Sequence, residues 1–220
     1  MIELKNIFLA YNKEYYALYD ISLVIENGEK IALVGEEGSG RTALLRIIAG
    51  LEKQKKGEAY IDNQPISKVN FETDVKLGYL TSKAVFMEHK SVYKNLAYVL
   101  KIRGVSKELW ESKINQVLEK FDILNLKDAK VGTLCLSDRR LVQIARLALR
   151  QLDIILCDNI EIGVEPKNFE KIKSAFYSLV EMNDKCIVII ACNKTDNWKE
   201  LITRTINMKS GSLEGEEVDE

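Results

Sequence analysis

The stretch Gly35–Thr42 reads GEEGSGRT and lies between two apolar segments, IALV at residues 31–34 and ALLRII at residues 43–48. This order predicts a strand, a glycine-rich loop and a helix. The three glycines allow the backbone to take positive φ angles and to approach phosphate oxygens closely. Successive backbone N–H groups and the positive end of the following helix then attract an anion. The stretch therefore predicts a phosphate-binding loop.

One position departs from the usual loop pattern G-x-x-x-x-G-K-[ST], because Arg41 stands where the lysine is expected. Arginine keeps the positive charge, but its planar guanidinium is longer than lysine and is not a compact point charge. Thr42 offers a hydroxyl to Mg²⁺. We expect phosphate binding to survive in a weakened or rearranged form; a glycine-rich turn that only links a strand to a helix is the alternative interpretation.

Composition excludes several classes of protein. The chain has 220 residues, 46% hydrophobic and 30% charged, which is typical of one globular domain with a smaller subdomain. A formal net charge of −1 gives no indication of nucleic-acid binding. The sequence predicts no bilayer-spanning segment and no signal peptide. A single histidine, His89, excludes a Ser-His-Asp site and argues against zinc, and we expect the four cysteines to be reduced.

Periodicity divides the chain into a β-rich start, a helical middle and an α/β end. Near-continuous apolar strands that alternate with helices indicate an α/β fold with a parallel sheet. The expected helical subdomain covers about Ser82–Arg150, and a β-hairpin is expected at residues 204–213. Strands are predicted at residues 3–10, 20–26, 30–34, 57–62, 76–80, 153–157 and 186–192, and helices at 91–103, 106–121, 138–150, 168–182 and 196–202.

The whole chain resembles the ATP-binding cassette (ABC) ATPase domain, a member of the P-loop NTPases. The strand IILC at residues 154–157 leads into Asp158, like the second Walker motif, and Tyr11 precedes the loop where the family has an adenine-stacking aromatic. The segment at residues 144–146 also has the family's spacing from the Walker aspartate. Residues 91–121 are most similar to the branch that serves cell-division and lipoprotein-release complexes.

The resemblance implies an α/β fold with an antiparallel β subdomain and a helical subdomain, and Mg-ATP as the ligand. It places the adenine on Tyr11 and Mg²⁺ at Thr42 and Asp158. The phosphates are expected on Gly35, Gly38, Ser39, Gly40, Arg41, Thr42 and Ala43.

Three expected catalytic positions hold other residue types. Asn159 stands where the family has the carboxylate that activates water, and an amide is no general base near neutral pH. Ser82, or alternatively Thr81, stands where a glutamine contacts Mg²⁺. Asn193 replaces the switch histidine and carries no positive charge. Glu165 keeps an acid where the loop after the Walker strand ends in aspartate.

The signature motif, normally LSGGQ, lies within residues 134–140, LCLSDRR, in one of two registers. One register places Cys135 in the serine position, and the other matches Leu136 and Ser137 but replaces the glycines by Asp138 and Arg139. Neither register keeps the Gly-Gly pair that approaches a neighbour's γ-phosphate. Arg139 and Arg140 either supply charge from the side or form a solvated face.

Because both halves of a shared ABC site are altered in one chain, we expect an ATP-binding subunit with degenerate motifs and absent or very slow hydrolysis. One alternative is an active transport ATPase that uses Glu161 or Glu165 as its base. A second is a GTP-binding protein that reads guanine with the N-K-x-D motif Asn193-Lys194-Thr195-Asp196. A third is a scaffold subunit that binds no nucleotide.

The resemblance also implies the surroundings of the protein. Its expected partners are an integral-membrane permease subunit and a second ABC ATPase chain, in a homodimer or a heterodimer, with no nucleic acid. The expected location is cytoplasmic and peripheral, on the inner face of the cell membrane. The helical middle, with Tyr93, Tyr98 and Trp110, is where the permease is expected to dock.

Overall fold

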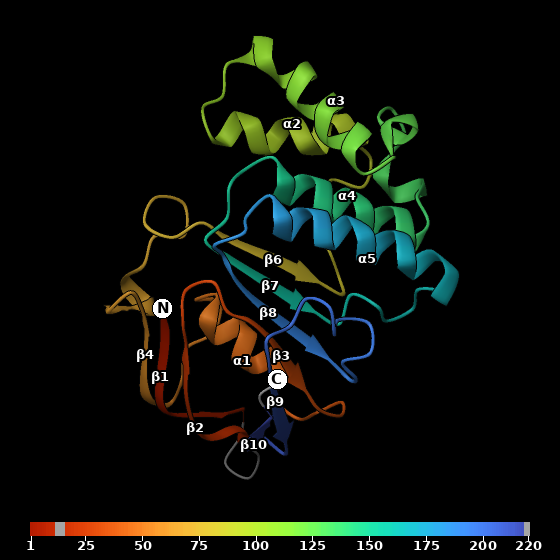
Figure 1. Ribbon diagram of the computed structural model, residues 1–220. Helices are drawn as coiled ribbons and strands as arrows, with labels where there is room; N and C mark the ends of the chain where they lie inside the picture. The colour runs from red at the N-terminus through yellow and green to blue at the C-terminus, as the bar shows by residue number, and fades with distance from the viewer. Residues whose placement is uncertain (12–15, 218–220) are drawn as a thin grey trace. The chain divides into compact units, whose positions relative to one another are not determined.

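The computed structural model describes residues 1–11 and 16–217. The described chain forms two compact units, one that contains the sheets and one that is mostly helical (Figure 1). The sheet unit contains Met1–Tyr79, Leu152–Asn159 and the chain from Asp184 onward, and the helical unit contains Leu80–Gln151 and Ile160–Asn183.

A six-stranded sheet with the order β10-β9-β3-β8-β7-β6 carries the ends of the expected site strands. Strand β3 pairs in parallel with both β8 and β9, and β7 pairs in parallel with β8. Every residue of β7 and β8 is buried, as the apolar runs predict. The strands are β3 (Lys30–Val34), β6 (Leu77–Thr81), β7 (Ile154–Asp158), β8 (Ile187–Cys192), β9 (Arg204–Lys209) and β10 (Ser212–Glu217).

A second, antiparallel sheet and helix α1 (Arg41–Ile48) complete the sheet unit. Helix α1 lies between the two sheets (Figure 1), because its residues Leu44, Leu45, Ile47 and Ile48 are buried in the same hydrophobic core as residues of both sheets. The packing of both sheets on α1 fixes the helix that begins at the glycine-rich loop. The antiparallel order is β2 (Tyr16–Ile25), β1 (Ile2–Ala10), β4 (Lys56–Ile61), β5 (Gln64–Pro65).

The helical unit contains four α-helices within its described residues, and α4 packs along α5 while α2 contacts α3 and α4 (Figure 1). Ser91 caps α2 as its sequence position predicts, because its hydroxyl accepts a hydrogen bond from the backbone N–H of Lys94 at 3.2 Å. The helices are α2 (Val92–Ile102), α3 (Trp110–Lys120), α4 (Leu136–Ala148) and α5 (Pro166–Glu181).

The structure confirms the α/β fold class and the closing hairpin, in which β9 pairs antiparallel with β10. The helix expected at residues 196–202 is wrong, because this segment is a series of turns. Trp198 is fully buried there and its backbone N–H binds the Thr195 carbonyl at 2.7 Å. A single buried tryptophan anchors the turns without the repeated apolar face of a helix. Helix α4 begins at Leu136, whereas the sequence predicts a helix that starts at residue 138, so more of the signature segment is helical than expected.

Candidate functional site

The glycine-rich loop joins β3 to α1 as its sequence predicts, and its conformation requires glycine. Gly38 and Gly40 have φ angles of 83° and 100°, in the region that disfavours other residues. At Gly35, an added Cβ would lie 2.3 Å from the carbonyl oxygen of Met208 in β9. The positive φ angles at Gly38 and Gly40 and the close approach at Gly35 explain why the loop has glycine at these positions, and α1 begins directly after the loop.

Arg41 begins α1, but its side chain turns into the protein and is only 5% exposed. Its Nη1 donates to the carbonyl oxygen of Cys192 at the end of β8. Its Nη2 donates to Asn193 Oδ1 at 2.8 Å and to the Glu36 carbonyl oxygen at 3.4 Å. The guanidinium thus connects the glycine-rich loop to the segment after β8, which brings together two of the predicted site residues.

Thr42 and Asp158 meet although they lie far apart in sequence, because β7 and the loop after β3 end at the same edge of the sheet. Thr42 Oγ1 donates to Asp158 Oδ1 at 3.0 Å. The hydroxyl of Tyr79 donates to Asp158 Oδ2 at 3.2 Å, a contact that the sequence did not reveal. Burial and the negative charge of Asp158 raise the pKa of Tyr79 far above its usual range, so the phenol keeps its proton and remains a donor.

Asn159 follows Asp158 in a left-handed conformation with φ 50°, which asparagine tolerates better than most residues. Its Nδ2 donates to Asp158 Oδ1 at 2.9 Å. Its Oδ1 is buried and accepts no hydrogen bond within the described residues. The amide therefore supports the neighbouring carboxylate and retains one acceptor for a further donor such as water.

A hydroxyl and a carboxylate are oxygen ligands of the kind that Mg²⁺ prefers. The Thr42 hydroxyl and the Asp158 carboxylate lie at hydrogen-bonding distance, and Thr42 belongs to an exposed position. Mg²⁺ prefers one or two such protein oxygens and completes its shell with water and substrate phosphate. The donor set therefore fits the metal expected from the sequence.

Tyr11 is 61% exposed, and its hydroxyl donates to Glu52 Oε2 at 3.2 Å. The same carboxylate forms an ion pair with Arg46 Nε of α1 at 3.0 Å. The contact ties the end of β1 to the residues that follow α1. The ring thus remains accessible to a planar ligand while its hydroxyl is held.

Ser82 belongs to the helical unit, and its backbone carbonyl is occupied by Arg140. The Arg140 guanidinium donates to the carbonyls of Ser82 at 2.7 Å, Thr81 at 2.8 Å and Ile160 at 3.2 Å. Arg140 is only 3% exposed. The expected solvated face is therefore wrong for this residue, because its charge is used inside the helical unit to hold the ends of two chain segments.

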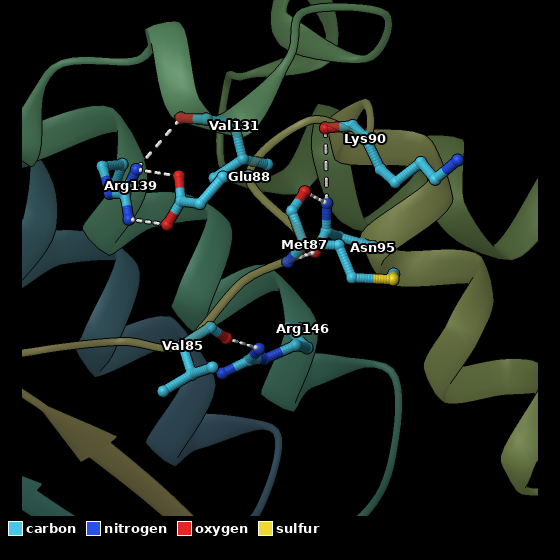
Figure 2. Close-up of polar contacts among 8 residues, drawn as sticks. All are labelled: Val85, Met87, Glu88, Lys90, Asn95, Val131, Arg139 and Arg146. Atoms are coloured by element: carbon cyan, nitrogen blue, oxygen red, sulfur yellow. Dashed lines mark hydrogen bonds and ion pairs between the residues drawn. The ribbon is translucent and has the colours of Figure 1, made fainter.

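Arg139 faces Glu88, as Figure 2 shows. It forms a two-pronged ion pair with Glu88, with both N···O distances 2.6 Å. Arg146 donates to the carbonyl of Val85 at 2.8 Å. The segment at residues 85–90 is thus fixed to α4 at two points.

Asn95 of α2 holds the same segment from the other side (Figure 2). Its Oδ1 accepts from the Met87 N–H at 2.9 Å, and its Nδ2 donates to the carbonyls of Met87 at 3.2 Å and Lys90 at 3.5 Å. A buried asparagine with both ends of its amide bound is a strong local constraint. No periodic pattern predicts this contact, because one buried polar residue on an amphipathic helix resembles an irregularity.

The signature segment lies at the start of α4 in either register, with Cys135 as the residue before the helix. Cys135 is exposed, and its Sγ lies 3.1 Å from Ser137 Oγ. The remaining cysteines, Cys157, Cys186 and Cys192, are buried free thiols, as expected.

Comparison with known proteins gives the family. The family model described as ABC transporter matches residues 18–160, which include the glycine-rich loop, the signature segment and Asp158. The chain belongs to the ABC transporter family. The resemblance inferred from the loop, Tyr11 and the Walker strand is thereby confirmed at the level of the family.

Two relatives with similar sequences are ATP-binding proteins of an import and an export system. The methionine import ATP-binding protein MetN of Clostridioides difficile is 28% identical over 219 residues, covering 97% of this chain and 67% of the relative. The lipopolysaccharide export system ATP-binding protein LptB of Escherichia coli K12 is 34% identical over 172 residues, covering 77% of this chain and 71% of the relative. This ABC chain spans about two thirds of the length of the MetN relatives that it matches.

Solved structures confirm the ATP-binding cassette fold. The dimeric bacterial ABC transporter cassette MJ0796 superposes with a TM-score of 0.85 and 26% identity, covering 99% of this chain and 98% of the cassette. The ADP conformation of the cassette MJ1267 gives a TM-score of 0.81 at 21% identity, covering 100% of this chain and 91% of that one. In the described part of this ABC chain, no helix has the length and hydropathy needed to cross a bilayer.

Proposed function

We propose that this chain is the ATP-binding subunit of an ABC transporter-like membrane complex and that it hydrolyses ATP very slowly or not at all. The observation that carries the proposal is the contrast between two parts of one site. The glycine-rich loop keeps the geometry that phosphate binding requires, with φ 83° and 100° at Gly38 and Gly40. The positions of the water-activating carboxylate and of the switch histidine hold the neutral amides of Asn159 and Asn193.

Nucleotide binding is supported by the loop, by α1 and by the metal donor set. The N–H groups of residues 35–43 and the N-terminus of α1 attract the phosphates, and the exposed ring of Tyr11 offers a stacking surface for the adenine. Thr42 and Asp158 would hold Mg²⁺, which neutralises phosphate charge when it is bound. Ser39 is buried in the loop and Ala43 in α1.

Slow hydrolysis follows from what the three substituted residues lack. The Asn159 amide donates to Asp158 at 2.9 Å and accepts a water at most, because an amide does not take up a proton near neutral pH. The Asn193 amide is bound to Arg41 and is neutral at every pH. Ser82 has a shorter side chain than the family's glutamine and lacks its amide. Loss of one catalytic group lowers a rate by several powers of ten, and such losses overlap rather than add.

The second candidate is an active transport ATPase, which is favoured by family membership and by relatives named as import and export ATP-binding proteins. In that case Glu161 or Glu165 must act as the base. Glu165 is exposed and pairs with Lys167 at 3.4 Å, so its carboxylate lies in contact with solvent. A carboxylate in contact with solvent is a weak base, and this argues against Glu165 in that role.

The partners follow from the family. We place this subunit on the cytoplasmic face of a membrane, with a permease and a second ABC chain, which is either the same chain or a different one. The solved cassette MJ0796 is described as a dimer. Docking on the permease is supported by exposed apolar side chains in the helical unit, whereas Tyr93 and Trp110 are half-buried. These exposed side chains are Val85, Tyr98, Ile102 and Leu109. Assignment to the cell-division and lipoprotein-release branch stays a prediction.

The test combines thermal unfolding with phosphate release. Mg-ATP at 100 times its dissociation constant stabilises the protein by about 2.7 kcal/mol, and Mg-GTP at the same concentration does so less. Phosphate release from the chain with its partners stays far below about 1 s⁻¹. A larger rise in melting temperature with Mg-GTP than with Mg-ATP supports the guanine motif Asn193–Asp196 instead. No rise with either nucleotide supports a scaffold, and phosphate release near about 1 s⁻¹ supports the active ATPase.

A further inference from the structure

Arg41 occupies an unusual place for the cation of a phosphate-binding loop. The residue is only 5% exposed, and its guanidinium donates to protein oxygens from two segments that are far apart in sequence. These are the Glu36 carbonyl within the loop, the Cys192 carbonyl at the end of β8, and Asn193 Oδ1. The side chain therefore links the loop to the segment after β8.

The number of hydrogens on Nη2 limits how many acceptors this nitrogen can bind at once. Nη2 carries two hydrogens, and its two bonds end on Asn193 Oδ1 at 2.8 Å and on the Glu36 carbonyl at 3.4 Å. If Nη2 is to donate to a phosphate oxygen, one of these bonds must break. The bond to Asn193 is the shorter one, but its acceptor is a side chain in an exposed position that can rotate away, whereas the Glu36 acceptor is a backbone carbonyl of the loop.

The pairing also explains why these two residue types suit each other. An amide oxygen accepts from a guanidinium without adding a charge, so Arg41 keeps its full attraction for an anion. A protonated histidine at position 193 would repel the guanidinium. A lysine at position 41 would lack the planar fork that reaches two acceptors at once.

We propose that Asn193 is a positioning residue that holds the Arg41 guanidinium against the loop, so that an incoming polyphosphate must displace Asn193 to bind Nη2. This inference rests on the proposed nucleotide binding. It implies that the Arg41–Asn193 bond lowers affinity in the free protein and is exchanged for a phosphate contact on binding. The nucleotide then releases the segment at residues 193–197 from the loop.

The first experiment measures Mg-ATP affinity by titration calorimetry in four proteins: wild type, Asn193→Ala, Arg41→Lys, and the double variant. Loss of one hydrogen bond to a charged group corresponds to about a tenfold change in binding. We expect Asn193→Ala to bind about tenfold more tightly than wild type and to change nothing in the Arg41→Lys background. Thr195→Ala, a neutral change in the same segment, serves as the matched control and keeps the wild-type affinity. Weaker or unchanged binding in Asn193→Ala, or an equal gain in the Arg41→Lys background, overturns the proposal.

The second experiment separates this inference from the proposed function. Hydrogen exchange of the backbone at residues 193–197 is compared in wild type with and without Mg-ATP. We expect faster exchange with the nucleotide, and fast exchange in Asn193→Ala under both conditions. If wild type binds nucleotide but exchange does not change, the displacement is wrong while nucleotide binding stands. If none of the four proteins binds nucleotide, the proposed function and the displacement both fail.

Discussion

Replacing Asn159 by glutamate is the change that restores the family's catalytic carboxylate, and the structure predicts that it destabilises the protein. The Asn159 amide now donates to Asp158 Oδ1 at 2.9 Å, and Asp158 is only 6% exposed. The glutamate loses this charge-assisted hydrogen bond, which is worth about 1.5–3 kcal/mol. It also places a second negative charge about 4 Å away, which costs about 4 kcal/mol at an effective dielectric constant of about 20.

Because a glutamate side chain can rotate partly away, we expect the free energy of unfolding to fall by at least about 2 kcal/mol without Mg²⁺. Urea denaturation of wild type, Asn159→Glu and Asn159→Gln measures this. Glutamine is the matched control, since it has the same length and shares the φ 50° backbone but keeps an amide. Saturating Mg²⁺ should recover much of the loss, because the metal neutralises the paired carboxylates.

The same variant tests the weight given to the other substitutions. We expect no brisk ATP hydrolysis from Asn159→Glu, since Arg41 and the signature segment remain altered. Equal stability of the glutamate and glutamine variants without Mg²⁺ would refute the electrostatic argument. Turnover near about 1 s⁻¹ would show that position 159 alone had silenced the site.

Four further substitutions probe three other contacts. Tyr79→Phe removes the donor to the buried carboxylate at the end of β7 and should lower stability by about 1 kcal/mol, with an unchanged slope in urea denaturation. Arg140→Met leaves three carbonyls without their donor and should lower the free energy of unfolding by at least about 3 kcal/mol. Arg139→Met breaks an exposed ion pair and should lower it by less than about 1 kcal/mol in the same urea denaturation. The Arg139 guanidinium lowers the pKa of Glu88 from its ordinary 4.5, so this pair stabilises the protein above that pH and the contribution is lost as pH falls through the lowered value. Urea midpoints from pH 7 to pH 3 should therefore fall less in Glu88→Gln than in wild type, and parallel curves would contradict the assignment.

The sequence predicts the frame of the site because the frame depends on local pattern. Glycines at fixed spacing between a strand and a helix predict the loop, and the apolar run before Asp158 predicts a buried parallel strand. The resemblance to ABC ATPases assigns both Thr42 and Asp158 to Mg²⁺, and the two side chains meet at 3.0 Å because β3 and β7 end at the same edge of the sheet.

The missed features are long-range contacts of single polar residues. Arg140 reads as one charge in an Arg-Arg pair, and only the fold shows that it is buried on three carbonyls. The bond between Arg41 and Asn193 joins positions about 150 residues apart, and no periodicity encodes it. Both contacts use backbone carbonyls or an amide, whose positions depend on tertiary structure rather than on residue type.

The most direct test of the account is one calorimetric titration of Mg-ATP into the purified chain in the presence of its partners. We predict a saturable heat of binding after which the baseline returns to its starting level, because nucleotide is held and not cleaved. Two results would contradict this: the absence of any binding heat, or a sustained heat flow that corresponds to about one turnover per second or more for each chain.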